Sequence, residues 1–210
     1  MSTFETEARL ARVAAGQCGV FTREQALHAG FSAAQVQRRL AAGAWVRVHP
    51  RTYRHAGSPP NRALFMAAAI LWAGHDSVLS HTTAAALWRM GGDAPGPVEV
   101  VVARTRAPRT PGVAVHRVAH LDPVDVTVTQ GGLGVTTPVR TLIDLAGVAP
   151  AADLAAILDR ARARGLVTRR ALEARLAAFG TRGRPGTARL RALLGTFGSA
   201  SAHASARMAG

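Results

Sequence analysis

The sequence predicts an α+β protein that opens with a winged helix-turn-helix and continues into a small mixed α+β domain with an antiparallel sheet and C-terminal helices. Two observations support the first unit: three short helical patterns occupy the first 42 residues, and an alternating hairpin follows them. In the second unit, short β-branched runs separated by Pro and Gly indicate strands, and helical periodicity returns after them.

The first two helices are delimited by their end residues. Apolar residues approximate a helical period over Phe4–Ala15, and Gly16 ends that segment. Thr22 and Gln25 have the spacing of a capping box, which satisfies backbone N–H groups at a helix start. We therefore expect a short second helix that begins after Thr22 and closes at Gly30.

A third helix and a hairpin complete the expected unit. Ser32 is the expected N-cap of a helix over 33–42. Residues 45–49 then alternate as a strand does, residues 50–51 form a turn, and residues 52–54 return as the partner strand. Three helices followed by such a hairpin are typical of a winged helix.

A linker is expected at Gly57–Pro60, because proline lacks a backbone donor and biases the preceding residue away from helix. Helices are expected over 62–73, 81–90, 140–146, 154–164 and 169–179, and strands over 98–102, 112–118 and 124–129. Gly, Ser and Ala dominate the last residues, which predicts a disordered tail. The predicted domains are therefore a winged helix at 1–58, an α+β domain at 59–194 and a tail at 195–210.

The net charge of +14 points to a polyanionic partner, and all 26 basic residues are Arg. Residues 1–58 carry 8 Arg against 3 acidic residues, and residues 151–210 carry 11 against 3. A basic surface attracts nucleic acid through long-range electrostatics and counterion release. Solvation of exposed helix faces is the competing explanation, above all near the C-terminus. The sequence leaves open whether DNA or RNA is the partner of one cluster: Arg160, Arg162, Arg164, Arg169 and Arg170.

The sequence predicts no membrane association and a cytoplasmic location. Its longest apolar run, 63–73, is shorter than the ~20 residues that a membrane span requires. The first residues lack the basic and then apolar order of a signal peptide. Cys18 is the single cysteine, so an internal disulfide or a cysteine-based zinc site is excluded.

The expected DNA-contacting residues follow from the motif. In helix-turn-helix proteins the second helix of the motif enters the major groove, where Arg pairs with guanine and Gln with adenine. The expected contacts come from the 33–42 helix, its N-cap and the hairpin: Ser32, Gln35, Gln37, Arg38, Arg39, Arg47, Arg51 and Arg54. Gln35 and Arg38 are the expected base readers, and the hairpin arginines are expected on phosphates. Trp45 and Tyr53 are expected in the core.

The residue types that are absent exclude several enzyme classes. Without Lys the chain cannot hold a Walker A loop, a Schiff-base lysine or the lysine of a restriction-type nuclease site. His75 and His81 lie near a helix start, and His116 and His120 fall across a strand end, where a four-residue interval does not place ligands on one helical face. We therefore expect no catalytic residue, no metal and no cofactor.

Several segments taken together resemble AbiEi-type antitoxins. The resemblance extends from about residue 5 to residue 194 and lies in Gly19–Thr22, Gln35–Leu40, Trp45–Pro50 with Tyr53, Leu79–His81 leading to Ala84–Trp88, and Thr136–Leu145. It implies the antitoxin of a type IV toxin-antitoxin system, whose winged helix binds inverted repeats in its own promoter and represses the operon. It further implies a nucleotidyltransferase toxin that is opposed without a stable complex. Dimerisation on the DNA is left open.

Two other functions compete with this interpretation. Longer chains of similar appearance continue into a restriction-endonuclease-like domain, whose metal-binding pattern has no counterpart in 195–210, because that segment contains no acidic residue and no Lys. A truncated nuclease or defence protein that retains only its nucleic-acid-binding domains is therefore the alternative. A protein-protein adaptor is the third candidate, and it predicts that Arg38→Ala and Arg47→Ala leave DNA binding unchanged.

Overall fold

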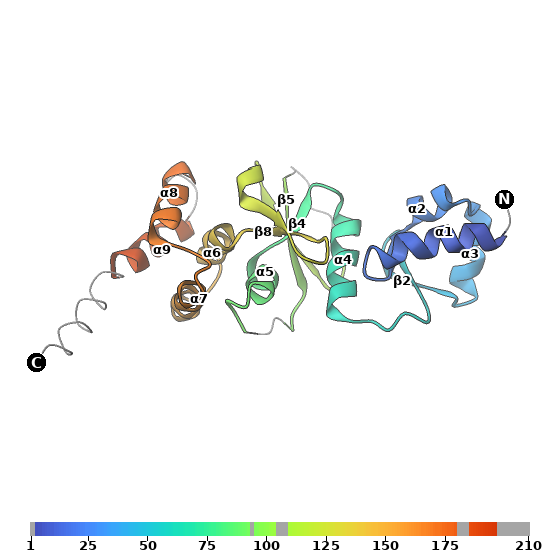
Figure 1. The fold of residues 1–210 in the computed structure, drawn as a ribbon, viewed down its shortest axis with the longest axis horizontal. Helices are drawn as coiled ribbons and strands as arrows, with labels where there is room; N and C mark the ends of the chain where they lie inside the picture. Colours follow the sequence, from blue (N-terminus) through green and yellow to red (C-terminus); the bar gives the residue numbers. More distant parts are fainter. Residues whose placement is uncertain (1–2, 93–94, 104–108, 180–184, 197–210) are drawn as a thin grey trace, which may run out of the picture. The chain divides into compact units, whose positions relative to one another are not determined.

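A computed structural model of the protein describes residues 3–92, 95–103, 109–179 and 185–196 (Figure 1). Its contacts group the chain into two compact units. The first unit holds Met1–Leu79 with Pro95–Val135, and the second holds Ser80–Ala94 with Thr136–Gly210. Among the described residues, no helix combines the length and the apolar character needed to cross a bilayer.

The first unit begins with the topology of a winged helix-turn-helix. The elements are α1 (Thr3–Ala15), β1 (Val20–Thr22), α2 (Arg23–Ala29), α3 (Ala33–Ala41), β2 (Trp45–His49) and β3 (Thr52–His55). The three strands form an antiparallel sheet in the order β1-β3-β2. The predicted helices and hairpin are therefore present. Strand β1 was not predicted, because three residues are too few to show an alternation.

An aromatic core joins the helices of this unit to its sheet. Phe21 and Phe31 meet Trp45 edge to face, with ring centroids 4.8 Å and 5.0 Å apart. Such pairs stabilise a core beyond the apolar area that they bury. Trp45 and Tyr53 are each only 3% exposed, which confirms that both are core residues. The apolar side chain of Val36 on α3 belongs to the same cluster, so α3 has a fixed inner face.

Helix α4 (Arg62–Ala73) packs on two sides within the first unit. Its Leu64, Ala67 and Ala68 bury against Val20 of β1, and the helix also contacts β4 (Ser77–Leu79) and β5 (Val98–Ala103). Because α4 contacts strands that come before and after residue 58 in the sequence, the packing continues across this position. The unit boundaries therefore fall elsewhere than residue 58, and the division into 1–58, 59–194 and 195–210 stays a prediction.

A second, five-stranded sheet follows α4. Its order is β6-β5-β4-β8-β7, with β6 (Val113–Val118), β7 (Val126–Val128) and β8 (Gly134–Thr136). Strands β4 and β8 were not predicted. Strand β4 is antiparallel to β5, whereas the predicted strand β6 runs parallel to β5 and β8 runs parallel to β4. The sheet is therefore mixed. Residues 124–125, expected at the start of the strand over 124–129, belong to a 3-10 turn that begins at Pro123.

The second unit is helical. Its helices are α5 (His81–Leu87), α6 (Pro138–Ala146), α7 (Ala151–Ala163), α8 (Arg169–Phe179) and α9 (Pro185–Thr196). Leucines from these helices form one apolar core, to which Leu190 and Leu194 of α9 contribute. Helix α9 was not predicted, because the Gly and Pro residues around its start obscure the helical pattern. It includes residues 195–196 of the expected tail, and residues 197–210 lie outside the described part.

A buried ion pair lies within α6, and its arginine also contacts α8. Arg140 Nε donates to Asp144 Oδ1 at 2.8 Å, and the Arg140 side chain is 1% exposed. Its guanidinium carbon lies 5.1 Å from the centroid of the Phe179 ring. Breaking such a pair leaves an uncompensated buried charge, so the loss of either side chain is expected to destabilise α6. Arg140 and Asp144 therefore serve the fold of the second unit.

Candidate nucleic-acid interface

Two capping boxes set the helix-turn-helix. Gln25 N donates to Thr22 Oγ1 at 3.1 Å, and Thr22 N donates to the Gln25 side-chain oxygen at 2.9 Å. Ser32 and Gln35 repeat this exchange at the start of α3, with distances of 3.2 Å and 2.7 Å. Gly30, at φ 113°, closes α2 in the left-handed conformation that favours glycine. The turn between α2 and α3 is thus fixed by local hydrogen bonds.

One face of α3 is open to solvent. Val36 is fully buried and Leu40 is partly buried, so the opposite side of the helix carries the exposed positions. These positions are Ala33, Ala34, Gln37, Arg38 and Ala41. Alanine side chains are short, so a ligand surface can approach the helix closely and the two long polar side chains can project into it. This is the geometry that insertion into a major groove requires.

Arg39 has a different environment from Arg38. Its guanidinium is ion-paired with Glu7 on α1 and lies 4.5 Å from the Phe31 ring centroid and 5.5 Å from that of Trp45. These contacts turn the side chain back over the core. Arg39 therefore holds α3 against α1 instead of lying on the open face.

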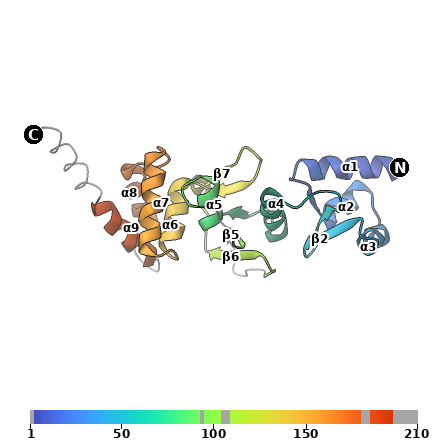
Figure 2. The same cartoon turned by 90° about the horizontal axis from the view of Figure 1, so that it is seen from below.

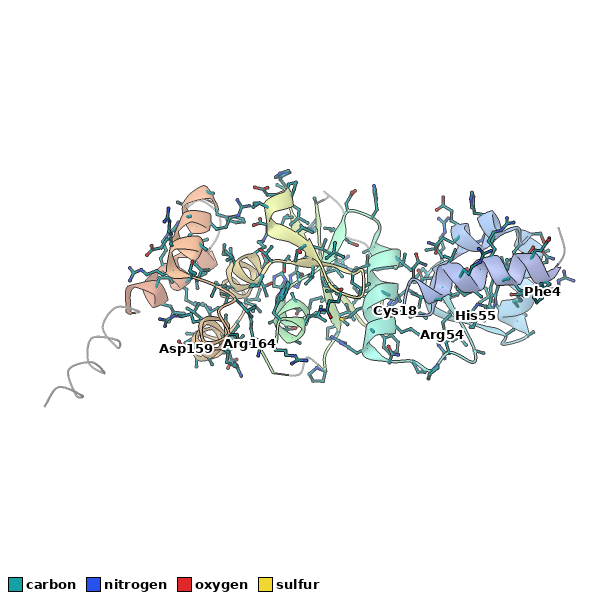
Figure 3. All side chains as sticks on the ribbon, in the orientation of Figure 1. Phe4, Cys18, Arg54, His55, Asp159 and Arg164 are labelled. Carbon is teal, nitrogen blue, oxygen red and sulfur yellow. The ribbon has the colours of Figure 1, made fainter. Side chains whose placement is uncertain are left out.

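Two further predicted residues also serve the fold. The side-chain oxygen of Gln35 is engaged by Ser32 N in the capping box. Arg54, labelled with His55 in Figure 3, donates from Nη1 to the carbonyl oxygens of His55, Ala56 and Ser58 at 3.1 Å, 3.1 Å and 2.7 Å. These bonds secure the chain that leaves β3.

The hairpin carries two exposed arginines, and one of its strands lies beside α3. Figure 2 shows β2 next to α3, and the two elements are in contact. Arg47 is exposed on β2, where it pairs with the buried Tyr53 of β3. Arg51 is exposed in the tight turn and has φ 62°. Of the eight predicted residues, the structure therefore exposes Ser32, Gln37, Arg38, Arg47 and Arg51.

Sequence reasoning missed Arg23 as a candidate. It is the first residue of α2, and its backbone N–H donates to the Arg51 carbonyl at 2.8 Å. The pairing of β1 with β3 creates this proximity, because it aligns Thr22 with Thr52 and so brings the start of α2 to the hairpin turn. The only local signal was a basic residue after an N-cap.

Within the first unit, His116 was considered as a metal ligand. Its Nε2 lies 4.0 Å from Glu99 Oε1, and burial lowers the pKa of His116 although Glu99 acts to raise it. The expectation of no metal stays a prediction.

The arginine cluster of the second unit is also exposed. Arg160, Arg162 and Arg164 lie at the end of α7, and Arg169 and Arg170 begin α8. Arg162 Nη1 lies 3.9 Å from Asp159, and Arg169 Nε lies 2.7 Å from Glu173. Two acidic side chains thus face five cations, which leaves an excess of positive charge on this surface.

Comparison with known proteins identifies the family. The sequence profile of the AbiEi antitoxin C-terminal domain matches residues 76–196, which is more than half of the chain. No curated protein matches it significantly. Among solved structures, the RV2827C protein from Mycobacterium tuberculosis superposes with a TM-score of 0.62 at 19% sequence identity, covering 92% of this chain and 77% of that one. At that identity the superposition establishes a shared fold. The chain belongs to the AbiEi antitoxin family.

Proposed function

We propose that this protein is the antitoxin of a type IV toxin-antitoxin system and represses its own operon by binding double-stranded DNA. The two functions are assigned to different parts of the chain. The winged helix-turn-helix binds inverted repeats in the promoter, and the domain that matches the antitoxin family opposes a nucleotidyltransferase toxin without a stable complex. Because an inverted repeat presents the same half-site twice, two copies of the protein occupy one operator.

The open face of α3 is the observation that carries the DNA-binding proposal. Gln37 and Arg38 project from a helix whose other exposed residues are alanines, and Arg47 lies on the strand beside it. We assign base contacts to Gln37 and Arg38 and phosphate contacts to Ser32, Arg47 and Arg51. Gln35, Arg39 and Arg54 contribute indirectly, because their side chains position α3 and the end of the hairpin.

A gel-shift titration tests the proposal. The full chain is titrated against the DNA upstream of its own gene and against a scrambled duplex of the same length at ~150 mM salt. Specific binding is expected to exceed non-specific binding by ~10³-fold or more. Equal affinity for the two duplexes would exclude sequence-specific repression.

The antitoxin function has a separate test. A nucleotidyltransferase gene beside this one is expressed with and without the chain, and growth is measured. The chain restores growth, and a variant with both Arg38→Ala and Arg47→Ala restores it equally when it is expressed from an independent promoter. Persistent toxicity in the presence of the wild-type chain would contradict the antitoxin assignment.

A further inference from the structure

A recess of about 290 Å³ lies within the first unit, between the start of α2, the hairpin turn and the last turn of α4. Its walls include Thr22, Arg23, Glu24, Arg51, Leu71 and Trp72. Small-molecule sites in proteins usually measure ~300–1,000 Å³, so this recess is of a size for one small ligand. Of the residues to which DNA contacts are assigned above, Arg51 alone also lines this recess.

The side chains around the recess have complementary chemistry. The indole ring of Trp72 can stack on a planar heterocycle, as aromatic residues do in single-strand-binding proteins. The guanidinium groups of Arg23 and Arg51 are suited to a phosphate, which they bind with charge-assisted hydrogen bonds. Glu24 and Thr22 supply a carboxylate and a hydroxyl, which can accept bonds from an amino or sugar hydroxyl group.

The aromatic wall is held in place by a buried neighbour. The ring centroids of Trp72 and His49 lie 5.8 Å apart, and His49 is 6% exposed. His49 Nδ1 in turn lies 3.5 Å from Thr110 Oγ1. Leu71, the residue before Trp72, packs against the apolar cluster that α4 forms with β1. The indole is therefore positioned before any ligand arrives, which reduces the entropy lost on binding.

The cationic wall is positioned by the backbone. Arg51 has φ 62°, a left-handed conformation that is strained for a residue with a side chain. Its carbonyl oxygen accepts the backbone N–H of Arg23 at 2.8 Å, so the two residues are adjacent in the wall of the recess. Glycine would adopt this turn without the strain, whereas Arg51 adds a guanidinium to the wall of the recess.

We propose that this recess binds a single nucleotide unit, with the base stacked on Trp72 and the phosphate held by Arg23 and Arg51. The unit comes either from a free mononucleotide or from an unstacked position in a single strand, and the chemistry is the same in both cases. The site does not depend on recognition of a promoter duplex by α3.

Isothermal titration calorimetry of the full chain tests the free-nucleotide source. CMP and AMP are compared with cytidine, adenosine and ribose 5-phosphate. The mononucleotides are expected to bind at least ten-fold more tightly than the nucleosides and the sugar phosphate. Trp72→Leu removes the advantage over ribose 5-phosphate, and Trp72→Phe retains most of it because the aromatic face remains. Arg51→Gly removes the advantage over the nucleosides and relieves the backbone strain.

The same variants are titrated with a single-stranded oligothymidylate. Weaker binding by Trp72→Leu, with Trp72→Phe close to wild type, supports a strand as the source when mononucleotides fail to bind. Arg12→Ala is the matched control, since this exposed arginine of α1 neither lines the recess nor has an assigned DNA contact, and its mononucleotide affinity is expected to be unchanged. The proposal is overturned if neither ligand responds to Trp72→Leu in a protein whose thermal melt is like that of wild type.

Discussion

Arg39 on α3 reaches back to Glu7 on α1, and its guanidinium also lies over the Phe31 ring. The adjacent Arg38 is exposed on the open face of the same helix. Two neighbouring arginines thus have separate tasks: Arg39 orients the helix, and Arg38 is free to contact a ligand.

A double-mutant cycle on Glu7→Ala and Arg39→Ala measures the ion pair. Both side chains are partly exposed, so the coupling free energy is expected at ~0.2–1 kcal/mol. Arg39→Ala alone costs more than Glu7→Ala, because it also removes the contact with Phe31, which contributes ~0.5–1 kcal/mol. Urea denaturation provides the free energies. Equal losses from the two single variants would show that the aromatic contact contributes nothing.

Arg38→Ala and Arg47→Ala are expected to affect DNA binding in different ways. Loss of a base contact by Arg38→Ala weakens operator binding by ~1–3 kcal/mol and reduces the ratio of specific to non-specific affinity. Loss of a phosphate contact by Arg47→Ala weakens binding to both duplexes and lowers the salt slope by ~1. Fluorescence anisotropy at several salt concentrations measures both effects. An unchanged specificity ratio for Arg38→Ala would rule out base reading by this side chain.

Substitutions at Ser32 separate helix capping from phosphate contact. Ser32→Ala removes the acceptor for Gln35 N and costs ~1 kcal/mol of stability. Ser32→Asp keeps a capping oxygen, so the stability is expected to match wild type. Its negative charge repels a nearby phosphate, so DNA affinity falls. If Ser32→Asp binds the operator as tightly as wild type, the phosphate does not approach this end of α3.

The stability of the protein is expected to fall as the pH drops below about 6.5. Burial lowers the pKa of His55, which Glu7 acts to raise and Arg39 to lower. Below the ordinary value of 6.5 the unfolded chain therefore binds more protons than the folded one, and the free energy of unfolding decreases until the lowered folded pKa is passed. Above pH 6.5 both states are deprotonated, and below the folded pKa both are protonated, so the dependence vanishes in these two ranges. The pKa values of His49 and His116 are also lowered by burial and add to the same trend.

His55→Phe is expected to reduce this pH dependence. No hydrogen-bond partner is found for its buried Nε2 among the described residues, and its ring already contacts Phe21 and Trp45. An apolar ring therefore fits the same surroundings. Urea unfolding at pH values from about 5 to 8 provides the comparison. His75→Gln is the control, because the His75 side chain is 89% exposed, and its profile should follow that of wild type.

Gly186→Ala and Gly195→Ala form a matched pair on α9. A Cβ at position 186 would overlap the backbone of Ala146 and Gly147, so Gly186→Ala is expected to destabilise the second unit by ~1–3 kcal/mol. A Cβ at position 195 meets no atom within 4 Å, so Gly195→Ala should be neutral or stabilising by up to ~1 kcal/mol. Thermal melts measure both. Equal melting temperatures of the two variants would show that the end of α6 and the start of α9 do not pack closely.

The helix-turn-helix and its hairpin could be predicted because their signals are local. Thr22 with Gln25, and Ser32 with Gln35, exchange hydrogen bonds over three residues, and the alternation of the hairpin is visible along the chain. The exposure of Gln37 and Arg38 follows from the helical period and the burial of Val36. The sequence by itself determined these elements and their order.

Tertiary contacts alone decided the tasks of the individual side chains. Glu7 meets Arg39 although 32 positions separate them, and Arg23 reaches the hairpin turn only because β1 pairs with β3. Strand β1 and helix α9 are likewise defined by the surfaces that bury them. The physical reason is that capping and periodicity act within one turn or strand. Ion pairs, strand pairing and the walls of a recess depend on which distant segments the packed core brings together.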